Sequence, residues 1–180
     1  CTEGIYRLGL DSKTLDTDGL IELLGRWIET YPIVSIEDPL AEDDLEGMKR
    51  FTLAYGEQIQ IVGDDFLATN AKKITDAVSN GICNAALIKL NQAGTFSETL
   101  DAVKTAKKAG WGTIVSARSG ETEEVSITHL AVGWNTLQLK VGSFARSERM
   151  AKWNEGLRIA EQMNYPVRYA GRSALTKYTD

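Results

Sequence analysis

Short apolar runs alternate with amphipathic segments along most of the chain. The runs are rich in β-branched residues, and several are hydrophobic at nearly every position, which is typical of strands covered on both faces. The segments between them repeat apolar residues at helical spacing. This alternation predicts strand–helix units and therefore an α/β protein with a parallel sheet. We expect strands at 6–11, 33–38, 59–65, 85–92, 112–119 and 136–143, and helices at 18–31, 42–55, 70–80, 95–109, 121–133 and 146–163.

The repeat length favours a barrel. Six units occupy residues 1–163, about 27 residues for each unit, and a (β/α)8 barrel takes roughly 250 residues for eight units. An open doubly wound sheet is the alternative, but the turn after the first strand lacks the GxGxxG pattern that usually marks that fold. We therefore predict one domain, an incomplete (β/α) barrel of about six units, followed by a C-terminal tail at 164–180. Because the chain starts with Cys1 directly before a strand, we interpret it as a fragment or a processed chain.

Composition and charge exclude several classes of function. The chain has 180 residues, of which 43% are hydrophobic and 25% charged, as in an ordinary soluble globular domain. The net charge of -5 argues against a nucleic-acid partner, and no apolar run reaches the roughly 18 to 20 residues that cross a membrane. There is no CxxC pair and His129 is the only histidine, which excludes zinc sites built from cysteines or from two histidines. We interpret Cys83 as a buried core residue and His129 as a structural or surface helix residue.

Every predicted strand ends in a polar residue, and the gaps between these residues follow the strand–helix period. Because the carboxyl ends of parallel strands share one edge, we expect these side chains around one site. Taken singly, each has another explanation, since an aspartate can cap a helix or form a turn and a lysine can reach solvent. Three carboxylates followed by three cations in register favour the shared site. The residues are Asp11, Glu37, Asp64, Lys89, Arg118 and Lys140.

The residue types at this edge indicate metal-assisted acid–base chemistry. Carboxylate oxygens without histidine or thiolate suit Mg²⁺ or Mn²⁺, and the facing cations suit an anionic ligand. A lysine near another lysine and a metal ion is a candidate general base, because its charged form is disfavoured there. Such a set is suited to removing a proton from the carbon next to a carboxylate. Arg118 and Ser119, just before a predicted helix, would form a clamp for phosphate or carboxylate.

The chain resembles the enolase family in ordered motifs that run from Leu8 to Glu161. The motifs are YPIVSIEDPLAEDD, IQIVGDD, IKLNQAGT, VSARSGETEE and LKVGSFARSERMAKWNEGLRIAEQ. The resemblance implies a metal-dependent barrel of the enolase superfamily, found in the cytoplasm as a dimer or larger oligomer. It also implies the interconversion of 2-phosphoglycerate and phosphoenolpyruvate, so that the ligand is a small phosphorylated carboxylic acid.

The resemblance further implies a role for each residue at the strand ends. Lys89 in IKLNQ matches the base that removes the C2 proton, and Lys140 in QLKVG matches the lysine that holds the substrate carboxylate. Arg118 and Ser119 match the pair that contacts the phosphate, which a second Mg²⁺ bridges in the family. The implied metal ligands are Asp11, Glu37 and Asp64, and the implied substrate-binding residues are Ser116, Arg118, Ser119, Lys140, Glu37 and Asp64.

The chain departs from the family pattern at several points. Where the family reads Ser-His-Arg-Ser, this chain has Ala117 in place of the histidine. Alanine offers neither a side-chain hydrogen bond nor a charge. The stretch after Asp11 is shorter than in common enolases. The small N-terminal domain, the general-acid glutamate and the mobile lid loops lie upstream in the family. We therefore expect this chain alone to be inactive.

Three hypotheses stay open at this point. The first is an enolase-type lyase that depends on Mg²⁺. The second is a catalytically degenerate relative or fragment with a binding or structural role, suggested by Ala117. The third is another acid dehydratase or racemase of the superfamily, although the phosphate-type motif SARSGE argues against it. In each case an incomplete barrel leaves open strand edges, so we expect a complementary N-terminal portion or a second copy of the chain as partner.

Overall fold

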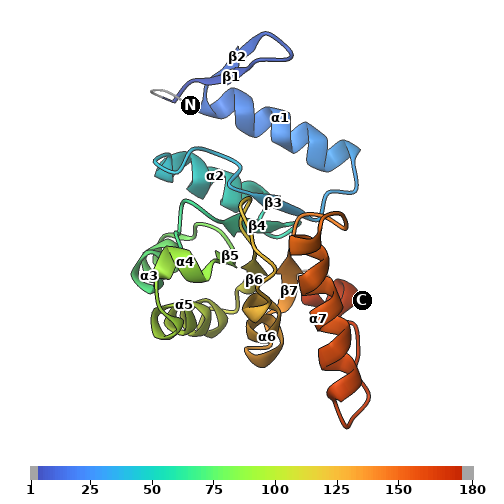
Figure 1. Ribbon diagram of the computed structural model, residues 1–180. Coiled ribbons are helices and arrows are strands. Elements are labelled where there is room, and N and C mark those ends of the chain that lie inside the picture. The colour runs from blue at the N-terminus through green and yellow to red at the C-terminus, as the bar shows by residue number, and fades with distance from the viewer. Residues whose placement is uncertain (1–3, 176–180) are drawn as a thin grey trace.

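The fold is built on a curled, five-stranded parallel sheet (Figure 1). The computed structural model describes residues 4–175, so Cys1 and the end of the predicted tail lie outside the described residues. The strands follow one another across the sheet in chain order, as the strand–helix alternation predicts. They are β3 (Ser35–Glu37), β4 (Gln60–Gly63), β5 (Ala85–Ile88), β6 (Gly112–Ser116) and β7 (Leu137–Lys140).

Side-chain contacts between opposite parts of this sheet show that it curls. At the carboxyl ends, the Lys140 Nζ atom of the edge strand β7 lies 2.7 and 2.6 Å from the two carboxylate oxygens of Glu37 on the other edge strand, β3. Deeper inside, Gln60 and Gln138 exchange amide hydrogen bonds of 3.2 and 2.9 Å. Gly112 leaves room for this pair, because a Cβ atom there would lie 2.7 Å from Gln60 Oε1. The sheet therefore closes part of a barrel, and the prediction of an incomplete (β/α) barrel is confirmed.

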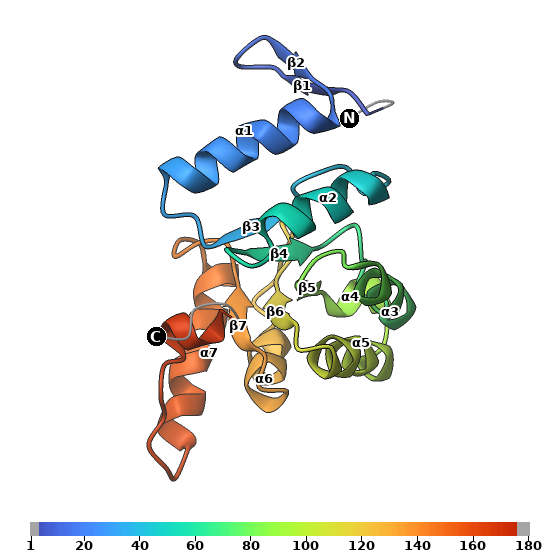
Figure 2. The same ribbon diagram turned by 180° about the vertical axis from the view of Figure 1, so that it is seen from behind.

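Helices connect the strands, and most of them lie on the outer side of the sheet. They are α1 (Thr17–Thr30), α2 (Leu45–Tyr55), α3 (Ala71–Asn80), α4 (Leu90–Ala93), α5 (Phe96–Lys108), α6 (Ser126–Gly133) and α7 (Ser147–Gln162), with a 3-10 helix at Gly171–Ala174. Both views show α3 and α5 side by side, with α6 and α7 next to β7 (Figure 2). The main core includes the fully buried Met48, Phe51 and Ile74, each of which contributes roughly 1.5 to 3 kcal/mol of hydrophobic stabilisation. Within residues 4–175, no helix is long and apolar enough to cross a membrane.

The first predicted unit differs from the structure. We expected a strand at 6–11 alongside the others, whereas β1 (Tyr6–Leu8) and β2 (Lys13–Leu15) form an antiparallel hairpin of their own. This prediction was wrong: the run YRLGLD alternates apolar residues with polar or small ones, a pattern that a local antiparallel hairpin satisfies and that is not typical of a strand covered on both faces. The turn at 9–12 closes locally, with Ser12 in the left-handed region at φ 50°. The hairpin lies beyond α1, away from the parallel sheet (Figures 1 and 2).

The helix α1 packs on α2 instead of the sheet. Leu24 is buried in the main core, and Gly25 permits a close approach, since a Cβ atom there would lie 2.0 Å from the Tyr55 hydroxyl oxygen. The carboxylate of Asp44, which caps α2, also accepts a 2.6 Å hydrogen bond from the Thr17 hydroxyl of α1. The hairpin and α1 are therefore attached to the barrel through α2.

The other predicted elements are present, with strands shorter than the apolar runs suggest. The run at 85–92 ends as a strand at Ile88 and continues as the short helix α4. The predicted tail contains the 3-10 helix, and the Ala174 carbonyl accepts a 3.0 Å hydrogen bond from the Gln138 side chain. This part of the tail thus packs against the interior polar pair of the barrel.

Candidate active site

A buried lysine–carboxylate pair lies at the carboxyl ends of two neighbouring strands. Lys89 follows β5, Asp64 follows β4, and the Lys89 Nζ atom lies 2.5 Å from Asp64 Oδ2. Each of the two side chains is only 10% exposed. The other Asp64 oxygen accepts a 3.2 Å hydrogen bond from Gln92, whose side-chain oxygen is in turn held by the Thr69 hydroxyl. The structure therefore brings these two predicted site residues together and fixes them through their neighbours.

A second lysine–carboxylate pair joins Glu37 and Lys140 across the mouth of the curled sheet. These two side chains are 32% and 46% exposed, so water reaches this pair more freely than the first. The residues are 103 positions apart in the sequence and lie on opposite edge strands. Only the curling of the sheet brings them into contact.

The two lysines line one pocket of about 430 Å³. Its charged lining is mainly cationic, and Asp65 is the acidic residue that lines it among the described residues. Ala117 also lines the pocket and offers only a methyl group there. Such a cavity suits a small ligand with more than one negative group. The polar lining residues are Lys89, Arg118, Ser119, Lys140, Ser143, Arg146, Arg149 and Asp65.

The loop after β6 carries the predicted phosphate-contacting residues. Arg118 and Ser119 line the pocket, and the Arg118 side chain donates a 2.8 Å hydrogen bond to Asn91 Oδ1. Ser116 is buried and donates its hydroxyl to the Ala117 carbonyl at 2.8 Å. It lines an adjoining hollow of about 650 Å³, which shares Arg118 with the pocket. The structure thus places Arg118 and Ser119 in the pocket and Ser116 beside it.

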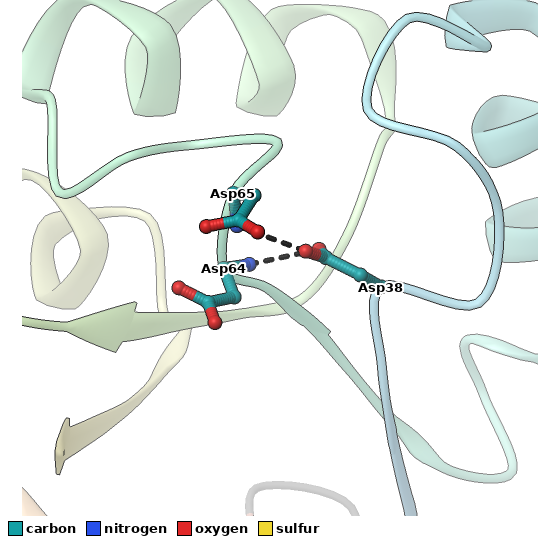
Figure 3. Close-up of side chains that lie close together, drawn as sticks. All are labelled: Asp38, Asp64 and Asp65. Carbon is teal, nitrogen blue, oxygen red and sulfur yellow. Dashed lines mark hydrogen bonds between the residues drawn. The ribbon is translucent and has the colours of Figure 1, made fainter. Parts of the chain in front are cut away.

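Asp64 of the Lys89–Asp64 pair also belongs to a cluster of three aspartates (Figure 3). Carboxylate oxygens of Asp38, Asp64 and Asp65 lie within 4.8 Å of one another. The two oxygens of Asp38 accept backbone N–H bonds of 2.8 Å from Asp64 and Asp65. Burial raises the pKa of the Asp38 carboxyl, these two hydrogen bonds oppose the increase, and the charges of Asp64 and Asp65 add to it. The sequence reasoning missed Asp38 and Asp65, although acidic doublets after two consecutive strands were an available signal.

The structure does not bring Asp11 to this cluster. Asp11 is exposed in the turn of the β1–β2 hairpin, which pairs locally instead of joining the sheet. Among residues 4–175, the acidic group compact enough to share a cation is Asp38, Asp64 and Asp65, without Asp11 or Glu37. Carboxylate oxygens are the ligands that Mg²⁺ and Mn²⁺ prefer, so this donor set fits such an ion. Asp64 is the residue common to the predicted ligands and the observed cluster.

Two buried cations of α7 lie behind the loop after β6, and the sequence reasoning missed both. Arg149 is 7% exposed and Lys152 is fully buried. The Lys152 Nζ atom lies 3.0 Å from Glu121 Oε2, while Glu121 Oε1 accepts the Arg118 N–H. Burial raises the pKa of Glu121, but the hydrogen bonds from Arg118 and Lys152 outweigh it and lower the pKa below the usual range. The available signal was a pair of cations three positions apart in an otherwise amphipathic helix.

The residues set aside from the site occupy the expected places. Cys83 is buried in the core, where burial and the nearby charge of Asp38 raise the pKa of its thiol. His129 lies on the surface of α6, with its Nε2 atom 2.9 Å from Glu155 Oε1. Both interpretations are confirmed, and neither residue belongs to the pocket.

Comparison with known proteins agrees with this geometry. Residues 3–178 match the family described as "Enolase, C-terminal TIM barrel domain". A relative named Enolase 1, from Desulfitobacterium hafniense (strain Y51), is 47% identical over 169 residues. The matched region covers 94% of this chain and 39% of the relative, so the chain spans well under half the length of that protein. The chain therefore belongs to the enolase family, within the region of its C-terminal TIM barrel domain.

Proposed function

We propose that the chain carries the base and metal-binding part of an enolase-type lyase that depends on Mg²⁺. Its reaction would interconvert 2-phosphoglycerate and phosphoenolpyruvate plus water. The observation that carries the proposal is the buried Lys89–Asp64 pair beside a cationic pocket. The name of the 47% identical relative, Enolase 1, supports the same reaction.

Lys89 is proposed as the base that removes the proton from C2 of the substrate. Removal of this proton leaves negative charge next to a carboxylate, so a base and several cations must surround the same carbon. Lys89 and Lys140 both line the pocket, which fits this requirement. The Asp64 carboxylate, 2.5 Å from Nζ, holds the Lys89 side chain in place and stabilises the ammonium once the proton has been taken up.

The substrate is proposed to be a small phosphorylated carboxylic acid that binds in the 430 Å³ pocket. Lys140 would hold its carboxylate, and Arg118 and Ser119 would hold its phosphate. An arginine can offer paired N–H donors to a phosphate, and the pocket supplies further cations around it. Ser116 would contribute only from the adjoining hollow, because its hydroxyl already donates to the Ala117 carbonyl.

The proposed metal ligands are Asp64 and Glu37, with Asp11 as a third when the segment 6–11 joins the barrel beside β3. Carboxylate oxygens of Asp38, Asp64 and Asp65 lie within 4.8 Å of one another, which supports binding of a divalent ion near Asp64. When bound, Mg²⁺, or Mn²⁺ in its place, would stabilise the negative charge that develops on the substrate. The proposal also includes the second Mg²⁺, which bridges the substrate phosphate in the family.

A second candidate function is that of a catalytically degenerate relative with a binding or structural role. Ala117 favours it, because this residue lines the pocket where the family offers a histidine. Restoring the histidine with Ala117→His separates the two functions. A large gain in dehydratase activity would indicate a degenerate enzyme, whereas unchanged activity with normal Mg²⁺ binding would indicate different chemistry, such as that of a related acid dehydratase or racemase.

We further propose that the open barrel works with a partner, in the cytoplasm. β3 and β7 end the strand order, and apolar residues at both edges, Val34 and Leu137, are 39% and 51% exposed. Open parallel edges of this kind favour association. The partner is a complementary N-terminal portion or a second copy of the chain, as in a dimer.

The experiment that tests this function measures exchange of the C2 hydrogen of 2-phosphoglycerate with solvent deuterium in the presence of Mg²⁺. The chain is assayed with the upstream portion of the relative Enolase 1 supplied as a second polypeptide. Replacement of Lys89 by alanine should slow exchange by about 100- to 10,000-fold, the usual effect of removing a general base. Lys72→Ala, which truncates an exposed lysine of α3, is the matched control and should leave exchange unchanged.

The proposal fails if exchange continues at the unmodified rate in the Lys89→Ala variant. A loss of exchange that also appears in Lys72→Ala would point to general damage and not to loss of a base. Folding of each variant is checked by its circular dichroism spectrum before the assay.

A further inference from the structure

We propose that Arg149 is a positioning residue for an oxyanion-binding loop after β6. Its guanidinium fixes the backbone carbonyls of Arg118 and Ser119. This arrangement leaves the N–H groups of Ser119 and Gly120 available to bind the oxyanion. The inference rests on the proposed function, because the oxyanion is the phosphate group of the proposed substrate.

The guanidinium of Arg149 joins two chain segments that are no longer paired as strands. Its Nη1 atom donates to the carbonyls of Arg118 at 2.8 Å and Val141 at 2.9 Å, and Nη2 donates to the carbonyl of Ser119 at 2.7 Å. The pairing of β6 with β7 ends just before, where the Ala117 N–H donates to the Lys140 carbonyl at 2.9 Å. Beyond that bond, hydrogen bonds from the buried guanidinium connect the two segments in place of backbone hydrogen bonds between strands.

The direction of these carbonyls determines the direction of the neighbouring N–H groups. No cis peptide occurs among the described residues, and in a trans peptide the C=O and the next N–H point in opposite directions. The Arg118 and Ser119 carbonyls point at Arg149 of α7, so the Ser119 and Gly120 N–H groups point to the other side of the loop. In the described part of the chain, neither N–H group donates a hydrogen bond within the protein. Two adjacent free N–H groups can bind an oxyanion, and Arg118 of the same loop lines both the pocket that Ser119 lines and the adjoining hollow that Gly120 lines.

A second buried cation, Lys152, binds the other end of the same loop. Lys152 Nζ donates to the Thr122 carbonyl at 2.8 Å and pairs with Glu121, whose other oxygen accepts the Arg118 N–H at 2.7 Å. This contact keeps the Arg118 N–H occupied and leaves the next two N–H groups free. The loop at 118–122 is thus held from α7 at both ends, which reduces the reorganisation that anion binding would otherwise require.

An arginine is needed at position 149 because of its shape. The planar guanidinium presents several N–H donors in a fixed fork, and here it serves three carbonyls of two segments. A lysine keeps the positive charge but has a single nitrogen, so it cannot hold all three carbonyls in this geometry. The substitution Arg149→Lys therefore separates the effect of position from the effect of charge.

The test is a titration of the ¹⁵N-labelled chain with inorganic phosphate, followed through the amide resonances of Ser119 and Gly120. In the unmodified chain, both resonances should shift saturably with phosphate. In Arg149→Lys, the phosphate affinity should fall about tenfold, and the amide resonances of 118–122 should already differ without phosphate. The matched control is Arg158→Lys, which alters an exposed arginine of the same helix and should leave the affinity unchanged.

If Arg149→Lys does not fold, Arg149→Gln decides. This variant keeps a side-chain amide that can donate to one carbonyl but loses the fork that holds three, and its phosphate affinity should also fall about tenfold. Unchanged phosphate affinity in whichever of the two variants folds overturns the inference, even if thermal stability falls. It is also overturned if phosphate does not shift Ser119 and Gly120 in the unmodified chain. These outcomes are distinct from a failure of the proposed function, because the phosphate titration follows the backbone amides of the chain alone, whereas the proposed function is tested by C2 exchange with the upstream portion present.

Discussion

The two lysine–carboxylate pairs of the site are chemically alike but are supported very differently. Lys89 and Asp64 follow adjacent strands in the middle of the sheet, and each side chain is 10% exposed. Lys140 and Glu37 belong to the two edge strands and are 46% and 32% exposed. The first pair is therefore shielded from water and salt, whereas the second is partly screened.

This difference shows how the fold fixes one half of the site more firmly than the other. The central pair is supported by Gln92, which donates a hydrogen bond to Asp64, and by Thr69, whose hydroxyl donates to Gln92. The edge pair exists only while the sheet stays curled. A partner that completes the barrel would consequently change the edge pair more than the central pair.

The largest expected effect comes from breaking the central pair. Asp64→Ala leaves the buried Lys89 ammonium without its carboxylate, which should lower the free energy of unfolding by about 3 to 5 kcal/mol. The measurement is urea unfolding followed by circular dichroism. As a control, Asp76→Ala breaks the exposed Lys72–Asp76 pair of α3 and should lower the free energy of unfolding far less. Equal losses in the two variants would mean that burial does not set the strength of the central pair.

Metal binding sharpens the comparison between the sheet and the hairpin. In the chain alone, Asp64→Asn should weaken Mg²⁺ binding about tenfold, because Asp64 belongs to the compact carboxylate cluster. Asp11→Asn should leave the affinity unchanged, since Asp11 lies in the turn of the separate hairpin. Isothermal titration calorimetry checks both. With the upstream enolase portion added, Asp11→Asn should acquire a defect, and its absence would exclude Asp11 as a ligand.

Breaking the edge pair should have a smaller effect on stability. Glu37→Gln removes the partly exposed carboxylate charge that pairs with Lys140, and the free energy of unfolding should fall by about 1 kcal/mol or less. The loss should shrink further in 1 M salt, because salt screens exposed charges. Urea unfolding at low and high salt measures it. A loss as large as that in Asp64→Ala, or one insensitive to salt, would contradict the view of the edge pair as solvent-screened.

The smallest expected effect is the pH dependence of the stability that the Glu121–Lys152 pair contributes. The pKa of Glu121 is lowered in the folded protein, so its charged form stabilises the fold above the ordinary value of 4.5. This stabilisation should disappear as the pH falls through the lowered pKa. The difference in unfolding free energy between the unmodified chain and Glu121→Gln should therefore be constant near neutral pH and shrink below about pH 4.5. A difference that grows on acidification would contradict the assigned direction.

Sequence patterns predicted the barrel strands well where the strands are covered on both faces. β4, β5 and β6 are buried at every position, so their continuous apolar runs were readable. The segment at 6–11 was predicted wrongly, because a short half-polar run does not say whether it pairs locally or with a distant strand. The predicted site residues Asp64, Lys89 and Arg118 follow β4, β5 and β6, and the predicted Lys140 ends β7. Asp38 and Arg149 were missed, because their roles depend on backbone groups of other segments.

The sequence by itself determined the order of strands and helices and the polar residues that end the strands, because periodicity and residue type are local properties. Only the tertiary structure decided which of those residues meet. The contact of Glu37 with Lys140 depends on how far the sheet curls, and Asp11 is kept apart by a hairpin that closes on itself. Curling and pairing are settled by the sum of many distant contacts, and no single segment encodes that sum.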